Sequence, residues 1–227
     1  MRTLSEERDI EAFMQSTARR QVGRRLALDV GAREGQSSKP YDRVGWLVIS
    51  LDIAIEGLRV GVKEGNIRPR RAVVADGRRL PFRDAAFDLV SSRWFLHEFP
   101  DQPAFLGEMK RVVRDRGAVV AVDFAAPDHA SQTFLNQYIL PDEHVRTCDQ
   151  FTEPWVGAGL GLERIEWHAR RIQEHEAEVR DAACGADRRV SEEVRRELHI
   201  TCDDEDVSLD IPIAFVVAHK EGSPEER

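Results

Sequence analysis

Short apolar runs and longer amphipathic stretches alternate along the first half of the chain. Runs of four to six mostly apolar residues predict strands, over residues 26–30, 46–51, 72–75, 87–91 and 118–122. The stretches between them carry apolar residues at helical spacing and predict helices, near 36–44, 54–64 and 102–113. Strands that alternate with helices are typical of a mostly parallel sheet that helices cover on both faces.

The segment before the first strand has the pattern of an amphipathic helix over residues 5–22. Four apolar side chains fall on one stripe of that helix, and they are Ile10, Phe13, Met14 and Val22. The letters TLSE at residues 3–6 offer a capping box at its start. We therefore expect residues 1–25 to form an N-terminal helix that packs on the domain.

The pattern changes after Asp123. Residues 124–150 contain two prolines and few periodic apolar positions, so they predict a loop-rich connection. Beyond them the sequence predicts a strand, one or two charged helices and a last strand, over residues 160–168, 174–198 and 211–219. The whole pattern predicts an α/β, Rossmann-like, doubly wound fold. Its sheet would have seven mostly parallel strands with an antiparallel last strand, and helices on both faces.

Composition narrows the class of protein. The 227 residues suit one domain over residues 26–220, followed by a disordered tail over 221–227. No apolar run approaches the roughly 20 residues that span a bilayer, and the N-terminus lacks the apolar region of a signal peptide. We expect a cytoplasmic protein without a membrane partner. The net charge of −8 argues against nucleic acid as the main partner.

The cysteines and histidines do not predict a metal site. Cys148, Cys184 and Cys202 are odd in number and widely spaced, and they match neither a zinc pattern nor a disulfide framework. We interpret all three as thiols. His168 and His175 lie too far apart for a metal pair on one helical turn.

Polar residues stand where the predicted strands end, and ligands of an open parallel sheet bind beyond those carboxyl ends. The candidates are Asp29 with the turn that reaches Gly35, Asp52, Asp76 with Gly77, and Ser91 with Ser92. Each acidic residue has a structural alternative. Asp29 could bind a loop amide, Asp52 could cap the following helix, and Asp76 could be a turn residue.

Residues 26–123 resemble the class I S-adenosylmethionine (SAM) methyltransferases, of the small-molecule group called type 11 or quinone-biosynthesis-like. The segment LALDVGAREG resembles the first motif, D-x-G-x-G-x-G, and does not fit the dinucleotide fingerprint G-x-G-x-x-G. LVISLDIAIEGLRVG resembles the ribose-binding motif, and VVADGRRLPFRDAAFDLV the adenine-binding motif. FLHEFPDQPAFLGEMKRVVRDRGAVVAVD and DIPIAFVVAHK resemble the family's later helix and strands.

The resemblance implies SAM as the cofactor and gives roles to the residues around its methionine end. Backbone atoms would line the methionine portion at Gly31, Ala32 and Gly35. Asp29 would lie near the methionine amino group, directly or through water. Two hydroxyls, those of Ser91 and Ser92, would lie beside the sulfonium that carries the methyl group.

The same resemblance places the adenosine end at the second and third strand ends. Asp52 would accept hydrogen bonds from the ribose hydroxyls, with Ile53 against the adenine. Asp76 would meet the adenine amino group, and Gly77 a ring nitrogen.

His97 stands where the family often has a residue that faces the methyl acceptor. A general base is needed only for an alcohol, a phenol or an acidic carbon, and histidine has a pKa close to neutrality. The structural alternative is a core-facing or helix-start histidine.

No Asn/Asp-Pro-Pro-Tyr motif or Pro-Cys pair follows the fourth strand. Because these motifs mark enzymes that act on nucleic acid, we expect a small-molecule acceptor. Residues 124–150 and 172–206 would form a lid over it. We expect a monomer or homodimer.

Two residues depart from the family pattern. Arg33 stands where the family usually has glycine, and Pro40 falls inside the expected first helix, where an interior proline costs about 3 kcal/mol. They motivate a second hypothesis, in which a methyltransferase-like domain has lost catalysis and serves as a binding or regulatory module. A third hypothesis, a nucleotide-dependent oxidoreductase, is disfavoured by the glycine spacing.

Overall fold

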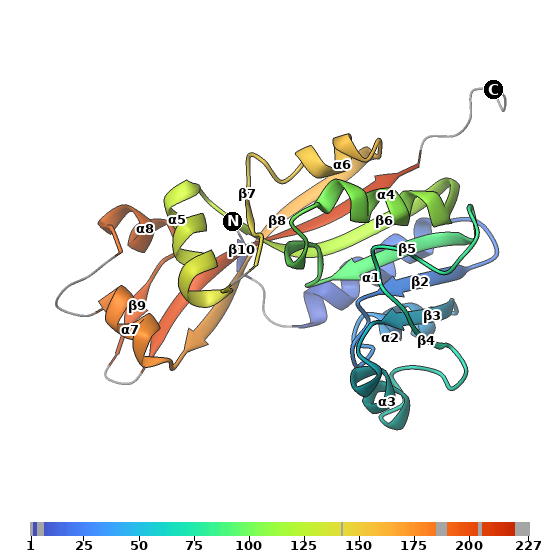
Figure 1. The fold of residues 1–227 in the computed structure, drawn as a ribbon, viewed down its shortest axis with the longest axis horizontal. Helices are drawn as coiled ribbons and strands as arrows, with labels where there is room; N and C mark the ends of the chain where they lie inside the picture. Colours follow the sequence, from blue (N-terminus) through green and yellow to red (C-terminus); the bar gives the residue numbers. More distant parts are fainter. Residues whose placement is uncertain (1, 4–6, 142, 185–189, 204–205, 221–227) are drawn as a thin grey trace.

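The fold is that of a computed structural model, which describes residues 2–3, 7–141, 143–184, 190–203 and 206–220. Within them, seven strands form the main sheet in the spatial order β8-β10-β6-β5-β2-β3-β4 (Figure 1). Their bounds are β2 Leu26–Val30, β3 Leu47–Asp52, β4 Ala72–Val74, β5 Phe87–Arg93, β6 Val113–Ala126, β8 Gly161–Glu174 and β10 Val207–His219. The strands from β6 to β4 pair in parallel, and β10 is antiparallel to both β6 and β8. This confirms the predicted mostly parallel sheet with an antiparallel last strand.

Three two-residue strands extend the sheet. β1 (Arg2–Thr3) pairs with β8 at the edge, β7 (Arg146–Thr147) pairs with β6, and β9 (Thr201–Cys202) pairs with β10. These short pairings tie the start of the chain and two connecting segments to the main strands.

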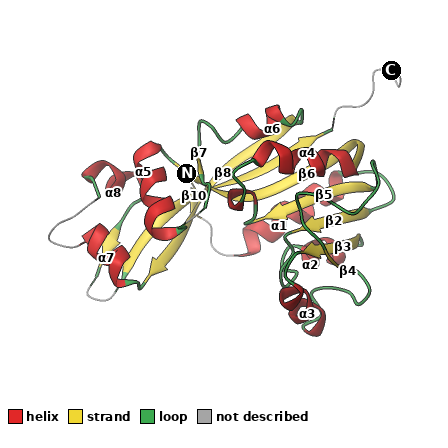
Figure 2. Ribbon diagram, viewed as in Figure 1, coloured by secondary structure: helices red, strands yellow, loops and turns green. Residues whose placement is uncertain are grey.

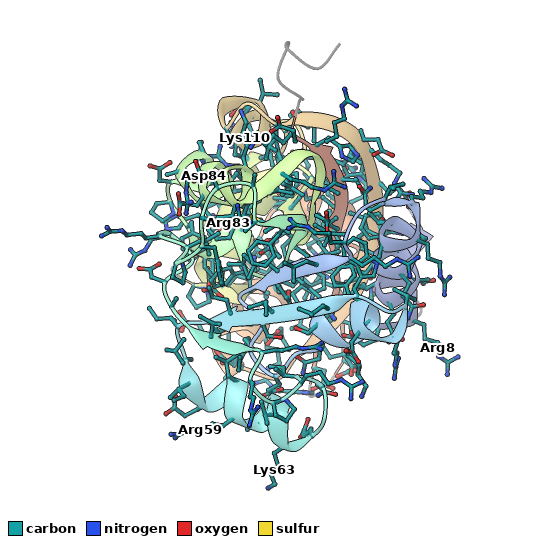
Figure 3. All side chains as sticks on the ribbon, turned by 90° about the vertical axis from the view of Figure 1, so that its right-hand side faces the viewer. Arg8, Arg59, Lys63, Arg83, Asp84 and Lys110 are labelled. Carbon is teal, nitrogen blue, oxygen red and sulfur yellow. A yellow bond between two sulfur atoms is a disulfide. The ribbon has the colours of Figure 1, made fainter. Side chains whose placement is uncertain are left out.

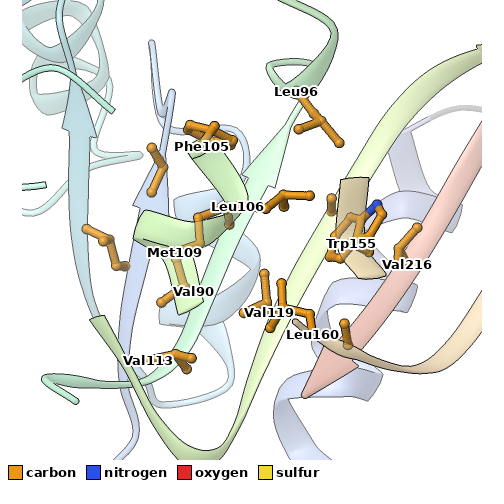
Figure 4. Packing of buried hydrophobic residues seen from close by; sticks show 14 of the residues in the cluster. Val90, Leu96, Phe105, Leu106, Met109, Val113, Val119, Trp155, Leu160 and Val216 are labelled. Atoms are coloured by element: carbon orange, nitrogen blue, oxygen red, sulfur yellow. The ribbon is translucent and has the colours of Figure 1, made fainter. Parts of the chain in front are cut away.

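Helices cover both faces of the sheet (Figure 2). On one face α1 (Glu7–Arg20) and α2 (Ser38–Arg43) pack on a core that contains Val120 and Phe215. On the other face α4 (Gln102–Val112) and α6 (Glu153–Gly157) pack on Val119 and its neighbours (Figure 4). Successive residues of one strand, 119 and 120, thus belong to opposite cores, as strand geometry requires. α3 (Ile55–Lys63) lies beside β3 and β4.

The predicted N-terminal helix is confirmed as α1. Ile10, Phe13 and Met14 are buried against the sheet. Val22 is 83% exposed, so its place on the apolar stripe was a wrong prediction, because the helix already ends at Arg20. Residues 4–6 of the predicted capping box lie outside the described residues.

The second half of the sheet is longer than its sequence predicts. β6 continues to Ala126 and β8 to Glu174, where the sequence predicts a helix. The predicted loop-rich connection contains α5 (His129–Phe134) and a π-helical turn, η2 (Leu135–Ile139). These helices pack with α7 (Ala177–Cys184), α8 (Glu192–Glu197) and the first half of β10 around a separate apolar cluster. The carboxyl end of β6 contributes Ala126 to that cluster, which places it beyond this edge of the sheet.

A disulfide joins Cys184 to Cys202, whereas the sequence predicts thiols at both positions. The two residues are 18 positions apart, and no Cys spacing pattern marks them. The pairing of β9 with β10 and the packing of α7 beside β9 bring their Cα atoms to 6.1 Å. Cys148 is a free thiol, as predicted.

Charged side chains cover the outside of the molecule, and Arg8, Arg59 and Lys63 point away from it (Figure 3). No helix in the described part of the chain is long and apolar enough to cross a membrane.

Candidate functional site

The loop after β2 makes a tight turn at the carboxyl edge of the sheet. Gly31, Arg33 and Gly35 have φ values of 73°, 44° and 81°. The amides of Gly31 and Ala32 both donate to the carbonyl of Leu51, at 2.9 Å each. A Cβ atom on Gly31 would lie 2.5 Å from the Phe95 ring, so glycine is required at this position. We call residues 31–35 the glycine loop.

Asp29 lies beneath the glycine loop and is fully buried. One carboxyl oxygen accepts a hydrogen bond from Ser38 Oγ at 2.6 Å, and the other accepts a long one from Ser91 Oγ at 3.4 Å. Burial raises the pKa of Asp29 to about 7, against the lowering effect of both serines. The structural alternative for Asp29, a bond to a loop amide, is wrong, because the carboxyl oxygens accept from the serine hydroxyls.

We predict that Asp29→Asn stabilises the protein more at pH 8 than at pH 4. Because the pKa of Asp29 is raised from 3.8 to about 7 on folding, its stabilisation is complete below pH 3.8 and is lost as pH rises through 7. Asparagine has no such loss, so the difference in unfolding free energy between variant and parent should grow by roughly 2–4 kcal/mol. Urea denaturation at both pH values measures it. The exposed Asp84→Asn is the control, and an equal difference at both pH values would contradict the assignment.

Asp52 connects the end of β3 to the glycine loop. Its Oδ2 accepts from the Arg33 amide and its Oδ1 from the Ala54 amide, both at 2.8 Å. The N-cap of α3 is Ala54, and no side chain caps the helix, so the helix-cap alternative for Asp52 is wrong. Each carboxylate oxygen has a second lone pair, and Asp52 therefore keeps acceptor capacity for a ligand. The neighbouring Ile53 is 64% exposed, which offers an apolar face at the same strand end.

Asp76 and Gly77 form the turn after β4. The Asp76 carboxylate accepts from the Arg78 amide and forms a two-pronged ion pair with the Arg78 guanidinium. These bonds lower the pKa of Asp76. The bond to the amide two residues further on is that of a turn residue, as the structural alternative for Asp76 states. The pair is exposed to solvent, so it contributes little to the stability of the fold. A Cβ atom on Gly77 would lie 3.1 Å from Phe105 and 3.3 Å from Phe95, so glycine allows the close approach of these rings.

Ser91 and Ser92 lie near the carboxyl end of β5 next to β2, where Ser92 is in register with Val30, and the strand continues to Arg93. Both are buried. The Ser92 hydroxyl has no hydrogen-bond partner among the described residues, which is uncommon for a buried polar atom.

His97 follows β5 and forms a buried pair with Asp123 at the end of β6. The imidazole Nδ1 and one Asp123 oxygen form a short hydrogen bond. The other Asp123 oxygen accepts from the Leu96 amide at 2.6 Å, which fixes the carboxylate. Burial, the largest effect, lowers the pKa of His97, but the charge and hydrogen bond of Asp123 outweigh it, and the net pKa is raised. A carboxylate that orients a histidine is the arrangement of an oriented general base.

A cavity of about 340 Å³ lies beside the glycine loop. Gly31, Ala32 and Arg33 line it from the loop, and Arg93 and Trp94 line it from the end of β5. Trp94 has a φ of 52°, a rare conformation for a bulky residue. Such backbone strain clusters at functional sites.

Comparison with known proteins agrees with this geometry. Residues 28–121 match the family model of a methyltransferase domain. Demethylmenaquinone methyltransferase of Streptomyces avermitilis is 34% identical over 114 residues, which are 50% of this chain and 48% of that protein. The chain spans about half the length of the curated relatives it matches.

Solved structures with the same fold cover nearly the whole chain. BH2331 of Bacillus halodurans C-125 has a TM-score of 0.82 at 20% identity, over 94% of this chain and 100% of that one. Geranyl diphosphate C-methyltransferase of Streptomyces coelicolor A3(2) has a TM-score of 0.65 at 14% identity, over 94% and 79%. At this identity they show the fold alone, and the shared fold continues beyond residue 121.

The helix that follows the glycine loop, α2, accommodates Pro40, contrary to the predicted cost. α2 begins at Ser38, so Pro40 lies in its first turn, where a backbone N–H has no intrahelical partner. Arg33 is exposed and lines the cavity without being buried in it. Its positive φ is a backbone shape that glycine adopts without strain.

We predict that Arg33→Gly stabilises the protein by about 0.5–1 kcal/mol. The substitution removes the steric cost of a side chain at φ 44°, about 1–2 kcal/mol, against a smaller entropy loss. For a chain of this size the melting temperature should rise by about 1–4 °C, measured by calorimetry. Glu34→Gly, at a position without a positive φ, should lower it. A melting temperature of Arg33→Gly at or below that of the parent would contradict the prediction.

Several residues of the site carry no signal that the sequence alone reveals. Glu7, Arg93 and Arg170 lie far apart in the chain and meet only through the packing of α1, β5 and β8. Asp123 and Phe95 lie inside the matched motifs, but nothing local marks the contact of Asp123 with His97 or of Phe95 with Gly31.

Proposed function

We propose that this protein is a SAM-dependent methyltransferase that acts on a small-molecule acceptor. One observation carries the proposal. The Asp52 carboxylate at the end of β3 holds the Arg33 amide at 2.8 Å, beside a cavity that the glycine loop lines. The glycine loop, the carboxylate of Asp52 and the cavity thus lie together at the edge where open parallel sheets bind ligands.

The residues present fit SAM at both ends. The exposed Ile53 and the Cβ-free Gly77 suit an adenine ring, and the spare lone pairs of Asp52 suit a ribose diol. Backbone of Gly31 and Ala32 reaches the cavity, whereas Asp29 does not line it. The predicted contact between Asp29 and the methionine amino group therefore stays a prediction. When bound, SAM supplies an activated methyl group, and the protein's part is to align it with the acceptor.

His97 is the proposed general base, and Asp123 is the residue that positions it. The Asp123 carboxylate accepts a hydrogen bond from Nδ1–H of His97. This leaves Nε2 as the nitrogen that takes a proton from the methyl acceptor. Phe124 packs edge-on against His97, with ring centroids 5.2 Å apart, and keeps the imidazole in a largely apolar setting. Such a base is required for a hydroxyl or acidic carbon acceptor.

Neither alternative hypothesis gains support. The impaired binding module rests on Arg33 and Pro40, and the structure accommodates both residues without closing the cavity. The glycine spacing still speaks against the oxidoreductase.

Transfer of a labelled methyl group tests the proposal. Protein, SAM labelled on the methyl carbon and a panel of small phenols, carboxylic acids and phosphate esters are incubated, and formation of S-adenosylhomocysteine (SAH) is followed. Turnover with at least one acceptor supports the proposal. Failure of the protein to bind SAM or SAH at millimolar concentration would reject it.

The remaining expectations belong to the same proposal. A cytoplasmic location, an oligomeric state of monomer or homodimer, and a role without nucleic acid stay predictions. The lid role of residues 124–150 and 172–206 also stays a prediction. It is supported by their common apolar cluster beyond the carboxyl end of β6. The Cys184–Cys202 disulfide argues against the cytoplasm, where such bonds are rare.

A further inference from the structure

Two guanidinium groups gather at one aromatic ring on the wall of the cavity. The Cζ atoms of Arg93 and Arg170 lie 5.4 Å and 5.2 Å from the centroid of the Trp94 ring. Arg93 is the last residue of β5 and Trp94 follows it, whereas Arg170 belongs to β8, three strands away in the sheet. All three residues line the cavity, and we call them the Arg–Trp cluster.

The hydrogen-bonding capacity of the Arg–Trp cluster is only partly used. The Arg93 side chain is 7% exposed and pairs with Glu7 at 2.5 Å, but its buried Nε atom has no hydrogen-bond partner among the residues that the structure describes. Within the part of the chain that the structure describes, the Arg170 side chain forms no ion pair or hydrogen bond. Its guanidinium group contacts the Trp94 ring. A buried donor without a partner is costly, so the cluster is suited to a ligand that supplies acceptors.

The charge of the cavity has the sign that attracts an anion. Its lining holds the guanidinium groups of Arg33, Arg93 and Arg170 and the carboxylates of Glu7 and Glu34. This excess of positive charge stands out in a chain with a net charge of −8. Guanidinium groups bind carboxylate and phosphate oxygens through paired, charge-assisted hydrogen bonds.

The Arg–Trp cluster is connected to the proposed base through a single ring. Trp94 stacks on Phe124 with ring centroids 4.4 Å apart, and Phe124 also contacts the His97 ring at 5.2 Å. Trp94 lines the cavity, and the stacked ring of Phe124 connects it to His97.

We propose that the Arg–Trp cluster binds a carboxylate or phosphate group of the methyl acceptor, with Trp94 against its adjoining apolar part. The acceptor is therefore a small organic anion. This inference rests on the proposed function. The same chemistry has a second source, the methionine carboxylate of the cofactor, and the experiment must separate the two.

Phenyl phosphate and its neutral counterpart benzyl alcohol are the probes, titrated into SAH-saturated protein and followed by NMR. We expect phenyl phosphate to bind at least about tenfold more tightly than benzyl alcohol. Arg170→Gln should lose at least about tenfold of this affinity, since it removes one of the two guanidinium groups. Glu7→Gln should strengthen it severalfold, because it frees Arg93 from its carboxylate. Arg59→Gln, the same charge change on the outside of α3, should leave it unchanged.

SAH affinity, measured on the same variants, distinguishes the two sources. Unchanged SAH affinity in Arg170→Gln, with loss of phenyl phosphate binding, supports an acceptor site. If the parent binds SAH but binds phenyl phosphate and benzyl alcohol equally tightly, the inference is overturned and the proposed function still stands. Loss of SAH affinity in Arg170→Gln with phenyl phosphate binding unchanged also overturns it, and assigns Arg170 to the methionine carboxylate. If the parent does not bind SAH, the proposed function fails, and the two probes without SAH still test the cluster for an anion preference.

Discussion

Asp52→Ala is expected to weaken SAH binding by at least about 100-fold. The proposed ribose contacts are hydrogen bonds to a charged group, each worth about 1.5–3 kcal/mol. Alanine also leaves the amides of Arg33 and Ala54 without the acceptor that now lies at 2.8 Å from each. The glycine loop would therefore lose part of its support together with the ribose contact. Calorimetric titration of parent and variant with SAH measures the effect.

Two further variants separate the ligand contact from the support of the loop. Asp52→Asn keeps one carbonyl oxygen as an acceptor and should bind SAH more tightly than Asp52→Ala. Asp76→Ala should cost less than about tenfold, because the Asp76 carboxylate is exposed and engaged by Arg78. Parental affinity in Asp52→Ala, with an unchanged melting temperature, would exclude Asp52 from the cofactor site.

His97→Gln is expected to lower the turnover number by about 10²–10⁴-fold for a hydroxyl or acidic carbon acceptor. The variant keeps hydrogen-bonding capacity toward Asp123 but has no group that titrates near neutral pH. SAH affinity should stay within about threefold of the parent, since His97 is not proposed to contact the cofactor. Initial rates at saturating SAM and acceptor measure the effect, and Glu98→Gln on the neighbouring exposed residue is the control.

The pH dependence of the rate tests the role of Asp123 separately. The base must be neutral to accept a proton, and Asp123 raises the pKa of His97. The rate should therefore fall as pH drops through a pKa above 6.5. Asp123→Asn removes the charge and leaves burial, so the acid limb should move to lower pH. An unmoved limb in Asp123→Asn, or a parental rate in His97→Gln, would contradict the dyad.

The parallel half of the fold was predictable because each strand and helix is marked by local periodicity. β2 has the predicted bounds, and β3, β4 and α3 differ by one or two residues. The second half was predicted less well, since the length of β8 and β10 depends on their mutual pairing. Long-range contact also decides the disulfide and the small apolar cluster, and no local pattern encodes either.

The candidate site divides in the same way. Asp52, Gly31 and Gly77 are recognisable because the motif and the strand ends lie together in sequence. The residues that contact Gly31 and His97 are not recognisable from the sequence. Phe95 lies against Gly31 from the end of a neighbouring strand, and Asp123 binds His97 from 26 residues away. The cavity gathers α1, β5 and β8, three elements whose meeting depends on tertiary packing.

A crystal structure of the protein grown with SAH tests the central proposal most directly. We predict the adenosine between Ile53 and Gly77, the ribose hydroxyls on Asp52, and the thioether near Gly31 and Ser92. The amino acid end should point into the cavity beside the glycine loop. Crystals grown at saturating SAH that show this edge of the sheet without ligand, or SAH bound elsewhere, would contradict the proposed function.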